Sequence, residues 1–296
     1  MLAKVISGAT VGLESLLVEV EVDITEKGLP TFKIVGLPGK AVEEAKERVR
    51  SAIKNSGLEF PRHKITINLT PADLPKEGPA YDLPIALGIL IANGQVEADL
   101  SKTLVLGELS LDGSLRHTNG VLPMALLCRE KKLKNLLLPH INAKEAGIVK
   151  GLNIYPVKSL LALIYHLSKI EKIEPQKHIS FNQLKKEKDF DFDMNEVTGQ
   201  ENAKRALEIA AAGSHNLFMT GPPGAGKTML ARTLPSILPE MTESEAFEVS
   251  KIYSITGNIP SGESIIKNRP FRSPHHTTSR IGLIGGGSKP SPGEIS

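Results

Sequence analysis

The 296-residue sequence has no tryptophan, a single cysteine and only 4% aromatic residues. One cysteine, Cys128, excludes an internal disulfide and any zinc site built from cysteines, which suits a reducing compartment; a small buried residue on a helix is the expected role. The low aromatic content argues against a broad surface on which nucleic-acid bases could stack. A bound nucleic-acid strand would therefore be held chiefly through its phosphates. The net charge of +3 is too small to indicate nucleic-acid binding by itself.

Long hydrophobic runs are also missing. The longest, residues 83–92, is too short to cross a bilayer and predicts a core helix instead. The N-terminal stretch has one early lysine, a glycine-broken apolar segment and an acid at Glu14, which does not fit a signal peptide. We therefore expect a cytoplasmic protein with no membrane partner. Hydrophobic content of 40% and charged content of 23% are typical of a globular chain, and the length allows about two domains.

Hydrophobic periodicity predicts an α/β domain in the first half of the chain. Apolar and polar residues alternate at 17–24 and 64–69, and short apolar runs follow at 104–106 and 136–138, which indicates four strands. Helical periodicity lies between or after them at 41–54, 84–92, 121–131 and 158–167.

A change of composition marks the end of this domain. Residues 168–194 are rich in charge and predict a linker, with a solvated helix of the first domain as the alternative. The predicted organisation is a domain at 1–167, the linker at 168–194 and a second domain at 195–296. The second domain opens with a helix carrying an apolar stripe: Ala203, Ala206, Leu207, Ala210 and Ala211.

The clearest chemical motif is "GPPGAGKT", which matches G-x-x-x-x-G-K-[ST] at Gly221, Gly226, Lys227 and Thr228. Residues 217–219 predict a buried strand before it, and 228–234 predict a helix after it. Such a turn surrounds phosphates with backbone N–H groups, while the lysine meets the β and γ phosphates and the hydroxyl binds Mg²⁺. A chance glycine-rich turn is the alternative, and a sheet-to-helix corner is the condition that the phosphate site must meet.

Two other segments resemble parts of an ATP site but do not match them. Gly36–Gly39 lacks the first glycine and the final hydroxyl of the motif, so it predicts a plain turn into a helix that pairs Glu44 with Arg48 on its wet side. Residues 103–113 resemble the apolar run plus acid that holds Mg²⁺ opposite a phosphate loop, but they lie far upstream of residue 221, and Leu-Asp-Gly at 111–113 predicts a hairpin turn instead.

The segment "VTGQENAKRALEIAAAGSHNLFMTGPPGAGKT" resembles AAA+ ATPases of the magnesium-chelatase-like group, and "RPFRSPHHTTSRIGLIGGGSKPSPGEIS" resembles the YifB/ComM family. The resemblance implies a P-loop AAA+ α/β domain that uses ATP and Mg²⁺, with Thr228 as the metal ligand. It also implies a ring, expected to be a homo-hexamer, that acts as an ATP-driven branch-migration helicase on single-stranded or branched DNA in DNA processing and competence. The nucleotide contacts that it implies are Val197, Gly199, Gln200, Gly221, Pro222, Pro223, Gly224, Ala225, Gly226, Lys227, Thr228 and Met229, with Lys227 and Thr228 in the catalytic set.

The first domain resembles the proteolytic domain of Lon, which has a ribosomal S5 domain 2-like fold. The match lies in residues 76–88 and 107–123, the segments that carry a Ser-Lys dyad in Lon. Here the serine position is Ala80 and the lysine position is Leu122. Neither side chain can act as nucleophile or base, so the resemblance implies the Lon-like fold without proteolysis.

AAA+ proteins also need an apolar strand that ends in Asp-Glu, a polar sensor and an arginine supplied to a neighbouring subunit. None follows Thr228 in the sequence. We therefore expect an N-terminal fragment or truncated product that binds ATP but hydrolyses it poorly.

The segment "FRSPHHTTSR" contains four candidate DNA contacts: Arg272, His275, His276 and Arg280. Phosphate contact and a loop packed between subunits both fit it. A metal site fits less well, because adjacent histidines on an extended segment point to opposite sides and no third ligand has suitable spacing. Two other functions stay open for the whole chain: a chelatase-type or protein-remodelling ATPase without a DNA role, and a Lon-like peptidase.

Overall fold

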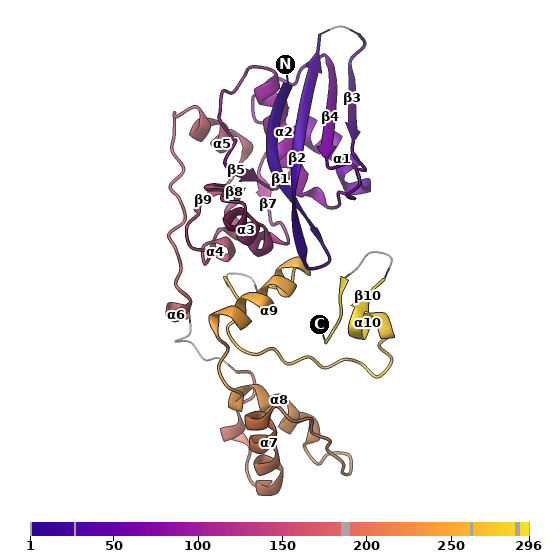
Figure 1. The fold of residues 1–296 in the computed structure, drawn as a ribbon, viewed down its shortest axis with the longest axis vertical. Coiled ribbons are helices and arrows are strands. Elements are labelled where there is room, and N and C mark those ends of the chain that lie inside the picture. Colours follow the sequence, from indigo (N-terminus) through magenta and orange to yellow (C-terminus); the bar gives the residue numbers. More distant parts are fainter. Residues whose placement is uncertain (1, 27, 185–189, 261–262, 288–290, 296) are drawn as a thin grey trace. The chain divides into compact units, whose positions relative to one another are not determined.

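The structure is a computed structural model that describes residues 2–26, 28–184, 190–260, 263–287 and 291–295. It divides into two compact units (Figure 1). Unit 1 comprises Met1–Ile179 with Lys251–Ser264, and unit 2 comprises Ser180–Ser250 with Ile265–Ser296. The predicted domain boundaries at 167 and 195 remain predictions.

A seven-stranded sheet with the order β3-β4-β2-β1-β5-β8-β9 forms the centre of unit 1. The β1/β2 and β2/β4 pairs are antiparallel, whereas β3/β4, β1/β5, β5/β8 and β8/β9 are parallel. All four predicted strands are present in it. The strand bounds are β1 Leu2–Val11, β2 Glu14–Thr25, β3 Thr31–Val35, β4 Lys64–Thr70, β5 Thr103–Val105, β8 Asn135–Pro139 and β9 Asn153–Val157.

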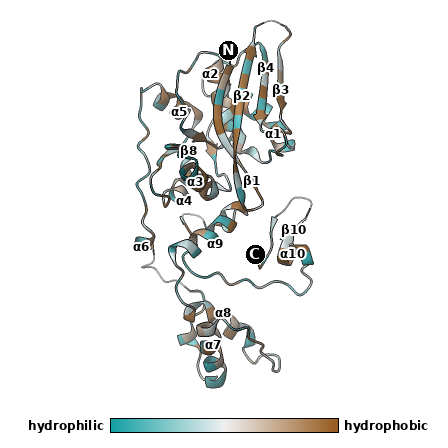
Figure 2. Cartoon of the chain, in the orientation of Figure 1, coloured by the Kyte–Doolittle hydropathy of each residue, from teal (hydrophilic) through white to brown (hydrophobic). Residues whose placement is uncertain are grey.

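The alternation that predicted β2 is the alternation of its burial. Val18, Val20, Val22 and Ile24 are buried, and the residues between them are partly or fully exposed. Figure 2 shows hydrophobic and hydrophilic segments alternating along β2 and β4. Because side chains of a strand point to opposite faces in turn, one face of the sheet packs against the core.

Helices cover both faces of β1. Gly88 of α2 lies against Val5 and Val22, and Gly8 of β1 lies against Met124 of α3. Since Val5 and Gly8 are three residues apart on one strand, they face opposite sides. The four predicted helices are confirmed as α1 Lys40–Asn55, α2 Asp82–Ala92, α3 Val121–Glu130 and α5 Leu160–Leu167, joined by the short α4 Ala143–Ala146 and the 3-10 turns η1 Pro79–Tyr81 and η2 His140–Asn142.

Three smaller predictions for unit 1 are also confirmed. The apolar run at 83–92 is a core helix, since nearly all of α2 is buried. Cys128 is a buried residue of α3. The Leu-Asp-Gly turn joins β6 Glu108–Leu109 to β7 Leu115–Arg116, with the Asp112 carboxylate accepting from the Ser114 N–H at 2.9 Å.

Helices are the main regular elements of unit 2, and long irregular segments join them. The predicted linker has no helix or strand over residues 171–180, then forms the one-turn α6, while residues 185–189 lie outside the described residues. The division between the units falls inside α9, after Ser250. The elements are α6 Phe181–Leu184, η3 Met194–Glu196, α7 Glu201–Gly213, α8 Lys227–Ile237, α9 Glu243–Ile255, α10 Arg280–Ile284 and the two-stranded pair β10 Gly285–Gly286 and β11 Ser291–Pro292.

Candidate functional site

The glycine-rich loop leads directly into α8. Gly226 is the N-cap of this helix and, like Gly224, has φ of 80°. A Cβ at either position would meet nothing within 4 Å, so these glycines are required by backbone conformation rather than by space. The first turn of a helix presents N–H groups without intrahelical acceptors and a partial positive charge. The loop therefore ends in the local geometry that binds anions at a helix N-terminus.

The Lys227 amine folds back over this loop. Its Nζ donates to the carbonyl oxygens of Gly221 at 2.9 Å and Pro222 at 2.8 Å. Pro222 also accepts from the Ala225 N–H at 3.4 Å, which closes the turn. These two bonds hold the Lys227 ammonium at the mouth of the loop. A phosphate there would compete with the two carbonyl oxygens for the N–H groups of the ammonium. Thr228 follows in the first turn of α8 and is exposed.

The strand predicted at 217–219 is wrong. These residues carry no strand, and Phe218 is 91% exposed. An apolar run becomes a strand only when a neighbouring strand accepts its backbone hydrogen bonds, and none of the described strands pairs with this segment. The structure thus shows a loop-to-helix corner in place of the expected sheet-to-helix corner. The sheet half of the condition set for the phosphate site is not met, so the site rests on the glycine conformations and the helix start alone.

The segment predicted to meet the adenine packs beside the same helix. The Met194 N–H donates to Ser236 Oγ of α8 at 3.0 Å. Val197 is buried in a cluster with Leu207 of α7 and Leu230 of α8. Gly199 and Gln200 follow with positive φ and lead into α7. The segment predicted to contact the base therefore packs against α8, the helix that follows the glycine-rich phosphate loop at 221–228. Of the other predicted nucleotide contacts, Pro223 and Met229 are exposed.

The four candidate DNA contacts lie in unit 2 on residues 271–284. Arg272 Nε donates to a Glu294 carboxylate oxygen at 2.7 Å, and Arg280 begins α10. His275 and Glu294 are among the residues around an open pocket of about 430 Å³. The Arg272 guanidinium in this pocket is therefore already paired with the Glu294 carboxylate.

The expectation that His275 and His276 point to opposite sides is wrong. Their ring centroids are 4.2 Å apart, because the backbone is a turn closed by a bond from the Thr278 N–H to the His275 carbonyl at 2.9 Å. Within the described ranges, no group of three or more His, Cys, Asp or Glu side chains is placed to hold a metal ion.

A capping arrangement at the start of α9 was missed in the sequence. The Thr242 N–H donates to Glu245 at 2.7 Å, the Glu245 N–H donates back to Thr242 Oγ1 at 3.3 Å, and Arg269 Nη2 donates to Glu245 at 2.8 Å. These bonds lower the pKa of Glu245 to about 2. The spacing T-x-x-E before a helical pattern was the available signal. Arg269 therefore stabilises a helix start.

The two positions that correspond to the Lon dyad carry neither a nucleophile nor a base. Ala80 is in η1, and Leu122 of α3 is fully buried. The Leu122 N–H donates to Glu145 Oε1 at 2.9 Å, and Glu145 accepts from Ser254 Oγ at 2.5 Å. Burial raises the pKa of this carboxyl. The polar groups beside Leu122 thus satisfy one another.

Comparison with known proteins places these features in a family. Two family models match the chain: "Subunit ChlI of Mg-chelatase" over residues 20–142 and "Magnesium chelatase, subunit ChlI" over residues 193–296. The competence protein ComM of Haemophilus influenzae is 45% identical over 100% of the chain. The chain belongs to the YifB/ComM family of magnesium-chelatase-like proteins. The two family models also support the predicted fold class, a Lon-like α/β domain followed by a P-loop AAA+ domain.

Two more relatives define how far the similarity extends. The uncharacterized protein YifB of Escherichia coli is 43% identical over 97% of the chain. The chain spans 58% of the length of the Haemophilus protein and 56% of the Escherichia protein. Lon protease 2 of Syntrophobacter fumaroxidans is 31% identical over 91 residues, which is 30% of the chain and 11% of that protease. In the described ranges, no helix combines the length and apolarity needed to cross a membrane.

Proposed function

We propose that this chain is the nucleotide-binding part of an ATP-driven DNA motor, a branch-migration helicase that works as a cytoplasmic homo-hexameric ring in DNA processing and competence. The observation that carries the proposal is the loop at 221–228, in which two glycines with φ of 80° lead into α8 and the carbonyls of Gly221 and Pro222 hold the Lys227 amine at the loop mouth. The similarity to a protein named for competence supports the competence role.

In this proposal ATP is bound by local groups of unit 2. The N–H groups at the start of α8 bind the phosphates, and Lys227 exchanges its two carbonyl acceptors for β and γ phosphate oxygens. The Thr228 hydroxyl holds Mg²⁺, which polarises the phosphates when bound. Val197, Gly199 and Gln200 border the base, positioned by the cluster of Val197 with Leu230.

The same proposal includes slow hydrolysis by this chain alone. Binding needs the phosphate loop, which is present, while hydrolysis needs an acidic strand and an arginine from a neighbouring subunit. The sequence after Thr228 has no apolar run that ends in Asp-Glu. We expect ATP affinity with little turnover.

A chelatase-type or protein-remodelling ATPase without a DNA role is the second candidate. Both matching family models describe a subunit of magnesium chelatase, which favours this function. DNA binding separates the two functions, because they share the phosphate loop.

The nucleotide-binding part of the proposal is tested by calorimetric titration of the full chain with ATP and Mg²⁺. The titration compares Lys227→Ala with Arg205→Ala. Arg205 is a matched control: it is an exposed cation of unit 2 whose ion pair is with Glu208 on the same helix. A hydrogen bond to a charged group contributes about 1.5–3 kcal/mol, so Lys227→Ala should weaken ATP binding by roughly 10- to 150-fold. Equal ATP binding by both variants would contradict the assignment of the loop.

The DNA half is tested by anisotropy titrations with labelled single-stranded and branched DNA at several salt concentrations. Phosphate contacts predict an affinity that falls steeply between 50 and 200 mM salt. Substitution Arg280→Gln should make this dependence shallower. Absence of binding at low salt would refute the DNA role and favour the chelatase-type function.

A further inference from the structure

Unit 1 contains a cationic pocket that the proposed function does not use. It has a volume of about 460 Å³ and lies at β3, the edge strand of the sheet. We name it the edge pocket. Its basic and aromatic lining residues come from three segments. They are Arg50 and Lys54 from α1, Phe60, Arg62 and His63 from the loop before β4, and Phe32 from β3.

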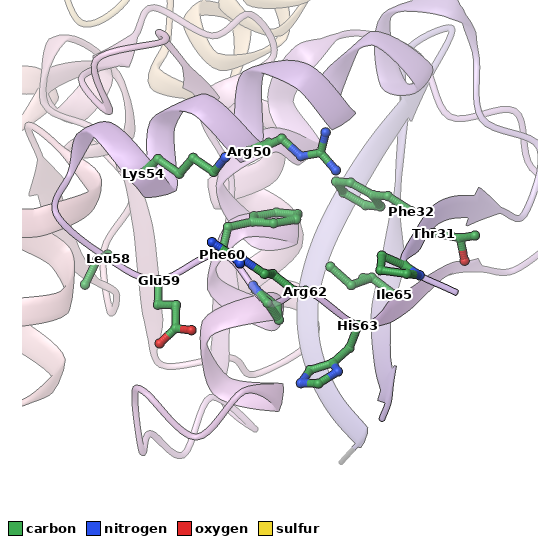
Figure 3. A pocket seen from close by; sticks show the side chains of 12 residues that line it. Thr31, Phe32, Arg50, Lys54, Leu58, Glu59, Phe60, Arg62, His63 and Ile65 are labelled. Carbon is green, nitrogen blue, oxygen red and sulfur yellow. The ribbon is translucent and has the colours of Figure 1, made fainter. Parts of the chain in front are cut away.

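Two aromatic rings form the apolar part of the edge pocket. The ring centroids of Phe32 and Phe60 are 5.8 Å apart with planes tilted by 43°. Figure 3 shows Arg50 and Lys54 extending from the helix above Phe60, with Phe32 beside the end of Arg50. The Arg50 guanidinium carbon lies 5.2 Å from the Phe60 centroid, which places a positive charge against an aromatic surface.

The cations of the edge pocket differ from other cations of the same helix. Lys46 is paired with Glu43, and Arg48 is paired with Asp82. In the part of the chain that the structure describes, Arg50, Lys54 and Arg62 have no ion pair. The one carboxylate in the lining is that of Glu59. The pocket therefore has excess positive charge.

The loop that carries these groups is fixed in place. Gln95 Nε2 donates to the Glu59 carbonyl at 2.7 Å, and the Glu59 N–H donates to Gln95 Oε1 at 3.0 Å. The Leu58 N–H donates to the Ile53 carbonyl at 3.1 Å, and Leu58 and Phe60 pack against the core of unit 1. Because these bonds fix the loop before a ligand binds, binding costs little conformational entropy.

We propose that the edge pocket binds one nucleotide, with the planar base against Phe32 and Phe60 and the phosphate at Arg50 and Arg62. Aromatic rings beside arginines are the groups that bind nucleotides through base stacking and phosphate pairing. The volume suits a ligand of this size. The nucleotide is either free or a unit of a single DNA strand. This site goes beyond the phosphate loop and shares no residue with it.

The test uses the full chain with two probes, thymidine 5′-monophosphate and a labelled eight-residue oligothymidylate. Neither carries the triphosphate for which the loop at 221–228 is suited. The variants are Phe60→Leu, which keeps an apolar side chain, and Arg50→Gln. The control is Lys46→Gln, which removes a cation of the same helix that has its own acid.

We expect Phe60→Leu to weaken binding roughly 5- to 150-fold, since stacking on one ring contributes about 1–3 kcal/mol per base. Arg50→Gln should weaken binding and make its salt dependence shallower, while Lys46→Gln should leave binding unchanged. Binding of both probes supports a free nucleotide as the occupant, and binding of the oligonucleotide alone supports a strand.

Three results would overturn the proposal. The first two are no binding of either probe at low salt and binding that both pocket variants retain. Equal binding of a polyglutamate peptide that is insensitive to Phe60→Leu would also overturn it, because charge alone would then explain the affinity. The edge pocket is judged by the loss of binding in Phe60→Leu and Arg50→Gln, whereas the phosphate loop of the proposed function is judged by the effect of Lys227→Ala on ATP binding, so failure of one site is distinguishable from failure of the other.

Discussion

Substitution Arg48→Met tests the buried ion pair that joins α1 to α2. Asp82 is fully buried and accepts from Arg48 Nε at 2.7 Å, from Arg48 Nη2 at 3.0 Å and from the Leu109 N–H at 3.2 Å. The variant leaves only the last of these bonds. Removing one partner of a buried pair costs about 3–5 kcal/mol. We expect about 3 kcal/mol at pH 8, because the Arg48 side chain is 21% exposed and the carboxyl can protonate.

The pH dependence of this loss has a definite sign. Burial raises the pKa of Asp82 to about 6, against the effect of Arg48. A carboxyl with a raised folded pKa contributes stability that is present below its unfolded pKa and lost as the pH rises through the folded value. Without Arg48 the pKa rises further, so the deficit of the variant should be largest at pH 8 and shrink towards pH 5.

Urea unfolding followed by tyrosine fluorescence measures this effect in unit 1. All four tyrosines lie within it: Tyr81, Tyr155, Tyr165 and Tyr253. Glu44→Ala is the matched control, since Glu44 is a second, exposed partner of Arg48 at 3.9 Å and should change stability by less than about 0.5 kcal/mol. Equal losses in the two variants, or a deficit that grows as the pH falls, would refute the reasoning.

Two further predictions concern the candidate site and the Lon-like positions. Thr228→Ala should weaken binding of Mg²⁺-ATP by about 10-fold and leave binding of metal-free ATP nearly unchanged, measured by titrations with Mg²⁺ and with EDTA; equal losses in both would argue against a metal contact. Ala80→Ser combined with Leu122→Lys should show no casein cleavage, because the Leu122 side chain is fully buried in α3. Cleavage by the double variant that neither single variant shows would contradict this.

The sequence predicted β2 and β4 because these strands are half buried, so the spacing of their apolar residues follows the spacing of their buried positions. It did not predict the partner of Arg48. The spacing to Glu44 suggested a surface pair, whereas the main partner, Asp82, is 34 residues away and is placed by the packing of α1 on α2. Local spacing shows which residues can meet on one helix, but contacts between helices depend on the tertiary fold.

The same distinction explains the failure at residues 217–219. The loop from 221 to 228 is determined by local rules, namely glycine conformation and the N–H groups of a helix start, and these are present in the structure. A strand depends on a neighbour from elsewhere in the chain, and no described strand supplies one here. Similarly, Ser254 belongs to unit 1 through a bond to Glu145 across 109 residues, which periodicity cannot reveal.

The edge pocket was missed for the related reason that its groups come from three segments. Phe32 reaches Phe60 because parallel pairing places Phe32 opposite Ile65, at the start of β4. The short run "FPRHK" after α1 was the sequence signal, and it has meaning only once β3 lies beside it. Since this pocket and the phosphate loop belong to different compact units and share no residue, Phe60→Leu should leave ATP binding intact and Lys227→Ala should leave oligothymidylate binding intact. That crossed pattern assigns each activity to its own site.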